Sequence, residues 1–281
     1  MEEKNYAMTC GIPFLQVKGV SLPDTWEKSI VELWEKGCNI PTQYDKKGDP
    51  LSRDATLAMV VLDPFSEPRI HRDLPTGLEE LEIYRQEVVL GIHDHWVGEK
   101  GWSYSYHDRL FKYPGSKEFI NQVDNIVRLL TEDSCSRRTI ASTWVPEIDC
   151  FHHEPPCLQN IWCRISEENG ELLLNMNTQW RSRDAYKAAF MNMFALTDLQ
   201  RVITELISGK IGRKVKIGRY VDISNSYHIY GSYFKEIDRI LNGIKNRSFE
   251  DRTYTTKFAE PFFEETREKL SKNPDFMRPN K

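Results

Sequence analysis

Apolar residues recur at the three- and four-residue spacing of an amphipathic helix in three stretches of the chain. In the first stretch, Asp24 stands at a helix-capping position, Glu27 follows it three residues later, and Gly37 ends the pattern. Ser116 opens the second stretch and Asn192 opens the third. A fourth segment is rich in glutamate and also has helical character. We therefore predict helices over residues 24–36, 77–90, 116–130 and 192–207.

Shorter apolar runs bounded by turn residues predict β-strands. Two of them, 161–165 and 172–176, flank Glu168-Asn169-Gly170, which has the composition of a hairpin turn. We predict further strands at 56–62, 139–145, 220–223 and 227–230, and an irregular aromatic segment at 94–109. No repeat or linker divides the chain. We therefore expect one α+β domain over 1–281, with a charged extension over 246–281 that wraps the domain or frays.

Composition narrows the class of protein. The 281 residues are 40% hydrophobic, which supports a full core, and the formal net charge of −4 argues against nucleic-acid binding. No apolar run approaches the roughly 20 residues that cross a bilayer. The first residues are acidic and polar, unlike a signal peptide. The six cysteines form no Cys-x-x-Cys pair, so we predict a cytoplasmic protein with reduced thiols.

One cysteine stands in an unusual setting. Cys157 follows Pro155 and Pro156 and opens an apolar run. Two prolines hold the preceding backbone extended and stiff, which is a good way to aim a side chain into a cavity. A free cysteine is also a common small core residue, so this stretch alone leaves a nucleophile and a buried hydrophobe both open. His152-His153 lacks further ligands at metal-binding spacing, and we expect no metal.

Two arginine-bearing segments are suited to phosphate. Arg137-Arg138 offers paired forked donors between a predicted helix and strand. Arg181 and Ser182 follow a predicted strand, where Asp184 would lock Arg181 or bond a sugar or base. The alternatives are a solvated basic turn for the first segment and a surface salt bridge for the second.

Other polar residues allow two interpretations each. An amide at Asn192 matches the imide edge of uracil, and it would equally cap the helix that begins there. His228 and Tyr230 share one face of a strand, where they would bond a sugar hydroxyl or serve the fold. Glu80 lies in a helix where a glutamate is usually solvated.

These segments become informative in combination. Their order along the chain resembles the thymidylate synthase family from residue 136 to residue 230. Upstream, Glu80–Tyr84 resembles the helix that carries the family's catalytic glutamate, and Tyr104–Arg109 resembles the Tyr-x-Tyr-Gly-x-Arg segment of the archaeal type. The matching segments are Ser136-Arg137-Arg138, Pro155-Pro156-Cys157, Arg181-Ser182-x-Asp184, Asn192 and His228-Ile229-Tyr230.

The resemblance implies a fold and a reaction. The fold would be a twisted mixed β-sheet that forms a dimer interface on one face and carries helices on the other. The reaction would transfer a one-carbon unit from 5,10-methylenetetrahydrofolate to C5 of a pyrimidine nucleotide monophosphate. Cys157 would add to C6 of the base, Glu80 would organise water and proton transfers, and Tyr106 would lie near the C5 proton.

The resemblance also assigns the binding residues. Arg181 and Ser182 would grip the phosphate, with Asp184 beside them. Arg137 and Arg138 would reach the phosphate in the neighbouring subunit of a homodimer. Asn192 would bind the base, and His228 and Tyr230 would bind the sugar. Arg53 would make the remaining phosphate contact.

Several positions depart from the family pattern. Leu158 replaces the usual histidine, Trp162 replaces a glutamine, and His107 replaces a glycine. Trp96 and Trp102 are the candidates for the tryptophan that shields the methylene intermediate. We predict methylation of deoxyuridylate first, because an asparagine at position 192 suits uracil. A hydroxymethylase acting on deoxyuridylate, deoxycytidylate or cytidylate is the alternative, and an inactive dimeric paralogue that binds nucleotide or RNA is a remote third.

Overall fold

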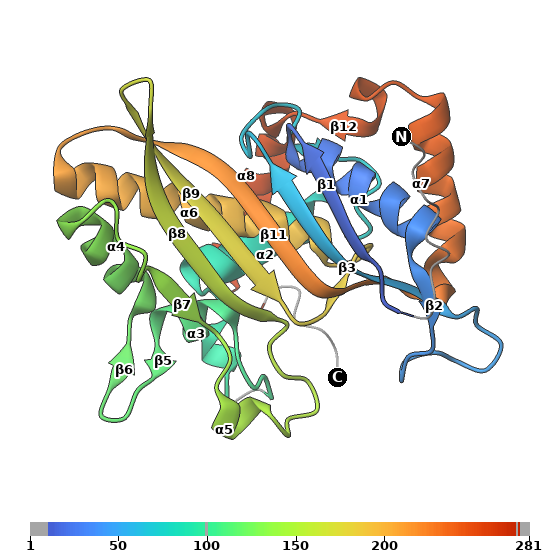
Figure 1. Cartoon of the computed structure of the whole chain (residues 1–281), viewed down its shortest axis with the longest axis horizontal. Helices are drawn as coiled ribbons and strands as arrows, with labels where there is room; N and C mark the ends of the chain where they lie inside the picture. The colour runs from blue at the N-terminus through green and yellow to red at the C-terminus, as the bar shows by residue number, and fades with distance from the viewer. Residues whose placement is uncertain (1–10, 99–100, 274, 276–281) are drawn as a thin grey trace, which may run out of the picture.

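A computed structural model describes residues 11–98, 101–273 and 275. The acidic N-terminal residues lie outside this range. A twisted mixed sheet runs through the molecule in the order β1-β3-β11-β9-β8-β7 (Figure 1). Two short strands join it, β2 on β3 and β10 on β11. The main strands are β1 (Phe14–Gly19), β2 (Cys38–Ile40), β3 (Ser52–Val61), β7 (Ile140–Ser142), β8 (Leu158–Glu168), β9 (Glu171–Trp180), β10 (Arg183–Asp184) and β11 (Val215–Ile229).

The long strand β11 is central to the sheet. It runs parallel to β9 and antiparallel to β3, with a register shift between Ser224 and Tyr227. The sequence predicted two short strands, 220–223 and 227–230, because polar residues interrupt the apolar pattern between them. β11 pairs with β3 before the irregularity and again after it, and the hydroxyl of Thr56 donates to the carbonyl of Asn225 within it (2.8 Å), so the two segments form one strand.

The predicted hairpin is confirmed. β8 and β9 pair antiparallel from Leu158↔Trp180 to Glu168↔Glu171. Asn169 and Gly170 have positive φ values of 52° and 78°, which the primed hairpin turns require and which asparagine and glycine tolerate best.

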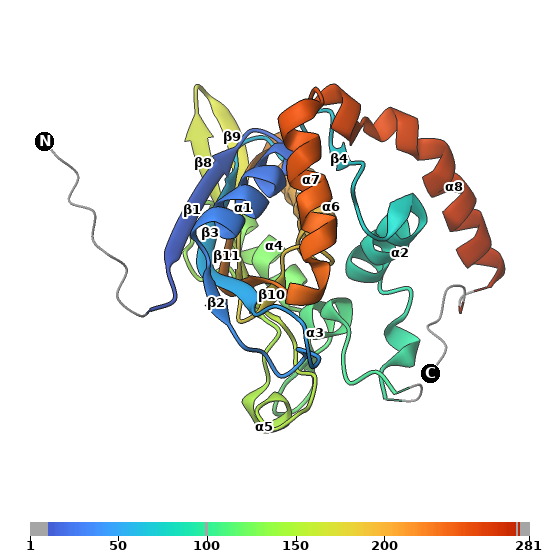
Figure 2. The ribbon, with the colours of Figure 1, turned by 90° about the vertical axis from the view of Figure 1, so that its right-hand side faces the viewer.

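Helices cover one face of the sheet (Figures 1 and 2). Burial alternates along each strand, as expected when one face packs on the core. The long helix α6 lies against β9 and β11 and is largely buried. The helices are α1 (Leu22–Lys36), α2 (Gly77–Leu90), α3 (Tyr106–Phe111), α4 (Gln122–Glu132), α5 (Pro146–Asp149), α6 (Ala189–Ile211), α7 (Phe234–Asn246) and α8 (Thr256–Lys272).

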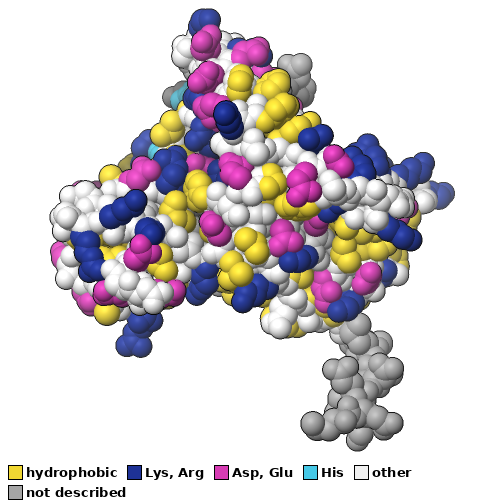
Figure 3. Space-filling view, turned by 90° about the horizontal axis from the view of Figure 1, so that it is seen from above, with side chains coloured by type: hydrophobic (Ala, Val, Ile, Leu, Met, Phe, Trp, Pro, Cys, Tyr) yellow, Lys and Arg dark blue, Asp and Glu magenta, His cyan; other side chains and the backbone are white. Residues whose placement is uncertain are grey.

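The opposite face of the sheet carries no helix of the described chain and leaves apolar side chains in solvent. Phe14 is 65% exposed and Ile140 is 52% exposed. Ile140 pairs with Trp162 across β7 and β8, so these two side chains share this face. We call this the open face. Over the surface seen in Figure 3, basic and acidic side chains are interspersed.

Helix α1 is tied to distant parts of the chain. Glu27, which is buried, accepts two hydrogen bonds from Arg252 (2.7 and 2.8 Å) and lies 2.9 Å from Nε2 of His71. Burial alone would raise the pKa of Glu27, but these partners outweigh it and lower that pKa. Next to it, the indole of Trp26 donates to the carbonyl of Ala185 (2.8 Å), which follows β10. Helix α1 therefore supports the segment that carries Arg181 and Asp184.

Two helix predictions need correction. The helix predicted from 116 begins at Gln122 with Asn121 as its cap, and Phe119 and Ile120 form the short exposed strand β6. A two-residue strand pairing, Tyr113–Pro114 with Phe119–Ile120, takes up the backbone that a helix would have used. Helix α1 starts two residues before the predicted Asp24, because Ser21 supplies the cap.

The end of the chain is ordered as far as it is described. Within the predicted extension 246–281, α8 packs against α2 and is joined to it by ion pairs Arg267–Glu82 (3.1 Å) and Lys269–Glu79 (2.7 Å). Glu82 is fully buried. No helix among the described residues is long and apolar enough to cross a membrane.

Candidate active site

A cavity of about 510 Å³ opens beside Cys157, and we call it the Cys157 cavity. It gathers side chains from strand ends, from the first turns of α3 and α6, from α2 and from the loop before β3. Eight of the twelve residues predicted from the sequence line it: Tyr106, Cys157, Arg181, Ser182, Asp184, Asn192, His228 and Tyr230. The remaining lining residues are Gln43, Tyr44, Tyr84, Trp180, Arg183 and Ala188.

Arg181 holds the segment that presents Cys157. Its guanidinium donates to the carbonyl of Pro156 (3.0 Å) and to that of Pro155 (2.7 Å), and its backbone N–H donates to the carbonyl of Cys157 (2.9 Å). Nη2 lies 3.6 Å from the Cys157 sulfur. Among the described residues, Nη1 has no hydrogen-bond partner and Arg181 forms no salt bridge, which was the predicted alternative.

Electrostatics at the thiol pull in two directions. Burial raises the pKa of Cys157, and the nearby charges of Arg181 and Arg183 oppose that increase without cancelling it. The free protein therefore holds Cys157 mainly as a thiol at neutral pH. Positive charge next to the sulfur still stabilises the thiolate when it forms.

Tyr106 lines the Cys157 cavity, and Tyr104 lies next to it with ring centroids 5.6 Å apart. The hydroxyl of Tyr106 accepts a hydrogen bond from the backbone N–H of Leu158 (3.3 Å), the residue after Cys157. Burial raises the pKa of Tyr106 and raises that of its neighbour Tyr104 to about 12. Both therefore remain protonated hydroxyls that are able to donate or accept. Leu158 itself is fully buried and points away from the cavity.

Asn192 is held by a buried polar network and not by a capping role. Helix α6 begins at Ala189, so Asn192 lies one turn inside it. Its Oδ1 accepts from Nε of Arg183 (3.3 Å), and its Nδ2 donates to the hydroxyl of Tyr84. Arg183 in turn forms an ion pair with the fully buried Asp222.

The opposite side of the cavity is formed by the end of β11. His228 lies near Tyr230, with ring centroids 4.7 Å apart, and its Nδ1 is 3.3 Å from the hydroxyl of Ser226. Asp184 accepts from the backbone N–H groups of Tyr186 and Lys187 (2.9 Å each), so it shapes the turn before α6 and does not lock Arg181. Burial raises the pKa of Asp184.

Four predicted residues lie elsewhere. Glu80 is on α2 one turn before Tyr84 and lines neither this cavity nor its neighbour. Arg53 donates to the carbonyl of Gly37 (2.9 Å) and is not among the described residues that line the cavity. Arg137 and Arg138 are exposed beside β7, next to the open face.

A second cavity of about 310 Å³ adjoins the first, and the two share Tyr84 and Tyr106. We call it the adjacent cavity. Aromatic rings and acidic side chains line it: Tyr84, Glu87, Trp102, Tyr104, Tyr106 and Glu154, with Val88, Gly101, Ser103, Ser105 and His152. Sequence reasoning missed Glu87, although it is seven residues after Glu80 and thus on the same helical face.

Glu87 is half-buried and pairs with the buried His93. Its Oε1 lies 2.6 Å from Nδ1 of His93, whose Nε2 is buried without a hydrogen-bond partner among the described residues. His93 stacks on Trp96 at 3.6 Å, and Trp96 packs edge-on against Trp102. The indole of Trp96 donates to Asp275 (2.7 Å), so the last described residue supports this wall.

The other two departures from the family pattern also lie outside the cavities. Trp162 is on the open face, where its indole donates to the carbonyl of Arg137 (3.1 Å). His107 bonds Asp94 (2.7 Å) and stacks on Phe111. Within the described residues, no group of three His, Cys, Asp or Glu side chains is placed to hold a metal ion.

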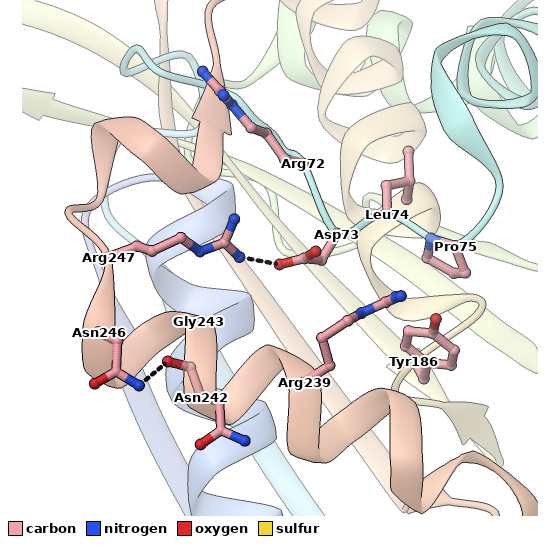
Figure 4. A pocket seen from close by; sticks show the side chains of 10 residues that line it. All are labelled: Arg72, Asp73, Leu74, Pro75, Tyr186, Arg239, Asn242, Gly243, Asn246 and Arg247. Carbon is pink, nitrogen blue, oxygen red and sulfur yellow. Dashed lines mark hydrogen bonds and ion pairs between the residues drawn. The ribbon is translucent and has the colours of Figure 1, made fainter.

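A larger cavity of about 640 Å³ lies between α7 and the segment before α2 (Figure 4). Its arginines include Arg247, which pairs with Asp73 at 3.2 Å. Neither a cysteine nor any residue predicted from the sequence is among the described side chains that line it. The Cys157 cavity and its neighbour are therefore the candidate active site.

Comparison with known proteins identifies a family over most of the chain. The family model described as thymidylate synthase matches residues 15–265. A protein from Methanopyrus kandleri named "Putative thymidylate synthase" is 37% identical over 191 residues, which cover 68% of this chain and 84% of that protein. One of the same name from Methanococcoides burtonii is 27% identical over 229 residues, 82% of this chain and 95% of that protein.

A solved structure shares the fold. The thermostable thymidylate synthase A from Bacillus subtilis superposes with a TM-score of 0.57 at 20% identity, over 79% of this chain and 84% of that one. At this identity the likeness concerns the fold. It agrees with the mixed α+β sheet that the sequence predicted.

Proposed function

This chain belongs to the thymidylate synthase family, and from that premise we propose that it methylates deoxyuridylate to thymidylate. The family makes it a transferase that moves a one-carbon unit to a pyrimidine nucleotide. One observation supports the finer proposal most directly. A single cavity brings together a cysteine, an arginine–serine pair suited to phosphate and an amide suited to the edge of uracil.

Cys157 is the proposed nucleophile. Its thiolate adds to C6 of the pyrimidine, and the electron pair of the C5–C6 double bond moves toward C5 and the C4 oxygen. Carbon C5 alone is too weak a nucleophile, and covalent addition divides the difficult step into two easier ones. The positive charge of Arg181, 3.6 Å from the sulfur, favours the thiolate that attacks.

Binding roles follow from position in the cavity. Arg181 offers Nη1 to the phosphate, next to Ser182, while its other nitrogens hold the two proline carbonyls. His228 and Tyr230 face the cavity from β11 and are the proposed sugar contacts. Asp184 holds the turn before α6 through the backbone N–H groups of Tyr186 and Lys187, and so helps to position the neighbouring Ser182.

The adjacent cavity is the proposed site of the one-carbon donor. The family uses methylenetetrahydrofolate as a cosubstrate, which supplies the carbon and a hydride. The cavity's rings, Trp102 and Tyr104, fit a flat bicyclic ring system, and its shared wall places it against the nucleotide. We assign the acid–base role to Glu87 in place of Glu80, since Glu87 lines the adjacent cavity and Glu80 lines neither. Tyr106, common to both cavities, would face the C5 proton.

A homodimer is part of the proposal. The open face exposes Phe14 and Ile140, and a second copy packed on it by two-fold symmetry would cover them. Arg137 and Arg138 stand next to this face, free to reach the partner's phosphate site. Arg53 donates to the carbonyl of Gly37 and is not among the described residues that line the Cys157 cavity of its own chain. We therefore assign it no phosphate contact.

A hydroxymethylase is the second candidate. The adjacent cavity contains Glu87, His152 and Glu154 among its lining residues, and such polar groups retain water. Water that reached the methylene carbon before hydride would yield a hydroxymethyl product.

A product assay tests both candidates. Purified protein is incubated with methylenetetrahydrofolate and, separately, deoxyuridylate, deoxycytidylate, uridylate and cytidylate. The mass of each nucleotide is measured, and dihydrofolate is followed by absorbance. Methylated deoxyuridylate with equal dihydrofolate supports the proposal. A hydroxymethyl product without dihydrofolate supports the alternative.

Cys157→Ala is the control, and it must abolish either product. Turnover that survives this substitution would contradict covalent catalysis at Cys157. Nucleotide binding without turnover of any substrate by the wild-type protein would favour the inactive paralogue.

A further inference from the structure

Arg183 lies behind the base-reading residue and is almost completely enclosed, with 2% of its surface exposed. It forms an ion pair with Asp222, donates to the carbonyl of Ala189 (2.8 Å), and lies over the ring of Trp180 at 4.3 Å. Its remaining contact is the hydrogen bond from Nε to Oδ1 of Asn192 (3.3 Å). The first three contacts hold the guanidinium in place, so Nε of Arg183 points to Asn192 in a fixed direction.

A guanidinium has donors only. The amide atom of Asn192 that faces Nε of Arg183 must therefore be the oxygen, because an NH₂ group in that place would set two hydrogen-bond donors against each other. On the other side, Asn192 meets the hydroxyl of Tyr84. A hydroxyl donates or accepts equally well, so Tyr84 does not select an orientation. Arg183 alone prevents the amide from flipping.

The fixed amide still has one N–H and one oxygen lone pair to offer the base. Asn192 lines the Cys157 cavity, and its Nδ2 points to Tyr84, which lines both cavities, so Nδ2 is on the side of the amide nearer the adjacent cavity. Carbon C5 must point toward that cavity to receive the one-carbon unit, and C4 is its ring neighbour. The amide N–H therefore meets the C4 substituent, and the amide oxygen meets N3.

Uracil matches this pattern at both positions, because O4 accepts and N3–H donates. Cytosine mismatches at both, because its amino group donates and its N3 accepts. We propose that Arg183 sets base specificity by locking the Asn192 amide in the orientation that reads uracil. This rests on the proposed function, since it takes the nucleotide pose from the covalent adduct at Cys157. Arg183 is a positioning residue: it acts on the base through Asn192.

The test is the ratio of dissociation constants for deoxycytidylate and deoxyuridylate, measured by calorimetry without folate. We expect the wild-type protein to prefer deoxyuridylate by at least about 100-fold, because two buried hydrogen bonds are mispaired with cytosine. The perturbing variant is the double substitution Arg183→Gln with Asp222→Asn. It removes both members of the buried ion pair, so no unpaired charge remains.

A glutamine at 183 accepts as well as donates, and the amide of Asn192 becomes free to flip. The preference for deoxyuridylate should then fall below about tenfold. Two further variants keep the test decisive if the double variant does not fold. Arg183→Lys retains a donor-only cation and should keep the ratio within about threefold of wild type. Tyr84→Phe removes the hydrogen bond that does not fix the orientation of the Asn192 amide, so the ratio of dissociation constants should again stay within about threefold of wild type.

The outcomes separate the two proposals. An unchanged ratio in a folded double variant, a collapsed ratio in Tyr84→Phe, or a wild-type preference for deoxycytidylate would overturn the role of Arg183 while leaving the transferase intact. A wild-type protein that binds no pyrimidine monophosphate would overturn the proposed function itself.

Discussion

Glu87 and Glu80 give a matched pair for testing which carboxylate serves the reaction. Both lie on α2, seven residues apart, and at about 1.5 Å per residue their Cα atoms are roughly 10 Å apart along the helix axis. A catalytic group must come within about 3 Å of the proton or water that it handles. Of the two, Glu87 is in the wall of the adjacent cavity, whereas Glu80 is not among the described side chains that line either cavity.

The perturbation is Glu87→Gln, which keeps the shape of the side chain and removes its charge and basicity. Loss of a positioned acid–base group costs about 10²–10⁴-fold in rate, or about 2.7–5.4 kcal/mol of transition-state stabilisation. We expect kcat for the one-carbon transfer to fall by that factor. Binding of deoxyuridylate should change by less than about threefold, because Glu87 does not line the Cys157 cavity.

Glu80→Gln is the control, with the same chemical change on the same helical face. It should leave kcat within about threefold of wild type. Steady-state kinetics on the nucleotide product measures both variants, and calorimetry with deoxyuridylate measures binding. A collapse of kcat in Glu80→Gln with little change in Glu87→Gln would refute the assignment of the carboxylate.

Three further outcomes follow from the structure. Arg252→Met removes the guanidinium that pairs with the buried Glu27 carboxylate and leaves it with His71. It should destabilise the fold by about 3–5 kcal/mol and lower Tm by about 5–9 °C at roughly 2.1 cal/mol/K per residue. Because the pKa of Glu27 is lowered on folding, the difference from wild type should be full at pH 7 and shrink as pH falls through that pKa; a difference that grows toward acid pH would contradict this. The rate of Cys157 alkylation by iodoacetamide should keep rising above the pH at which the rate of an exposed cysteine becomes constant, since burial raises the pKa of Cys157. Arg181→Met should move that pH higher still. A rate that becomes constant at a lower pH than for free cysteine would contradict the proposed electrostatics of the site. Trp162→Arg, on the open face, should yield a monomer in sedimentation, whereas a retained dimer would mean that subunits associate elsewhere.

The sequence predicted the elements that depend on local chemistry. The hairpin about Asn169-Gly170 requires positive φ values that those residues tolerate, and it formed as expected. The order of the motifs gave a family resemblance, and eight of the twelve residues that it marked line the Cys157 cavity. The prediction of a helix over 116–130 was wrong for its first residues, because Phe119, an apolar residue at helical spacing, pairs in a two-residue strand.

The rest of the site depended on geometry that spacing does not encode. Periodicity put Glu80 and Glu87 on one face of α2, but which turn reaches a cavity depends on how far that helix is displaced along the sheet. Arg183 looked like a spacer between Ser182 and Asp184. Its function is visible only with Asp222, which β11 brings beside it from a distant part of the sequence.

That distance bears on how the molecule assembles. Strand β3 pairs with β11, for example Leu57 with Ser224, and more than half of the 281 residues lie between them. Such non-local pairing makes a slow transition state, because chain entropy is lost before most contacts form. The same step closes the Cys157 cavity, whose lining runs from Gln43 to Tyr230. A bound nucleotide would therefore slow global unfolding and act as a folding ligand, protecting β11 amides from hydrogen exchange.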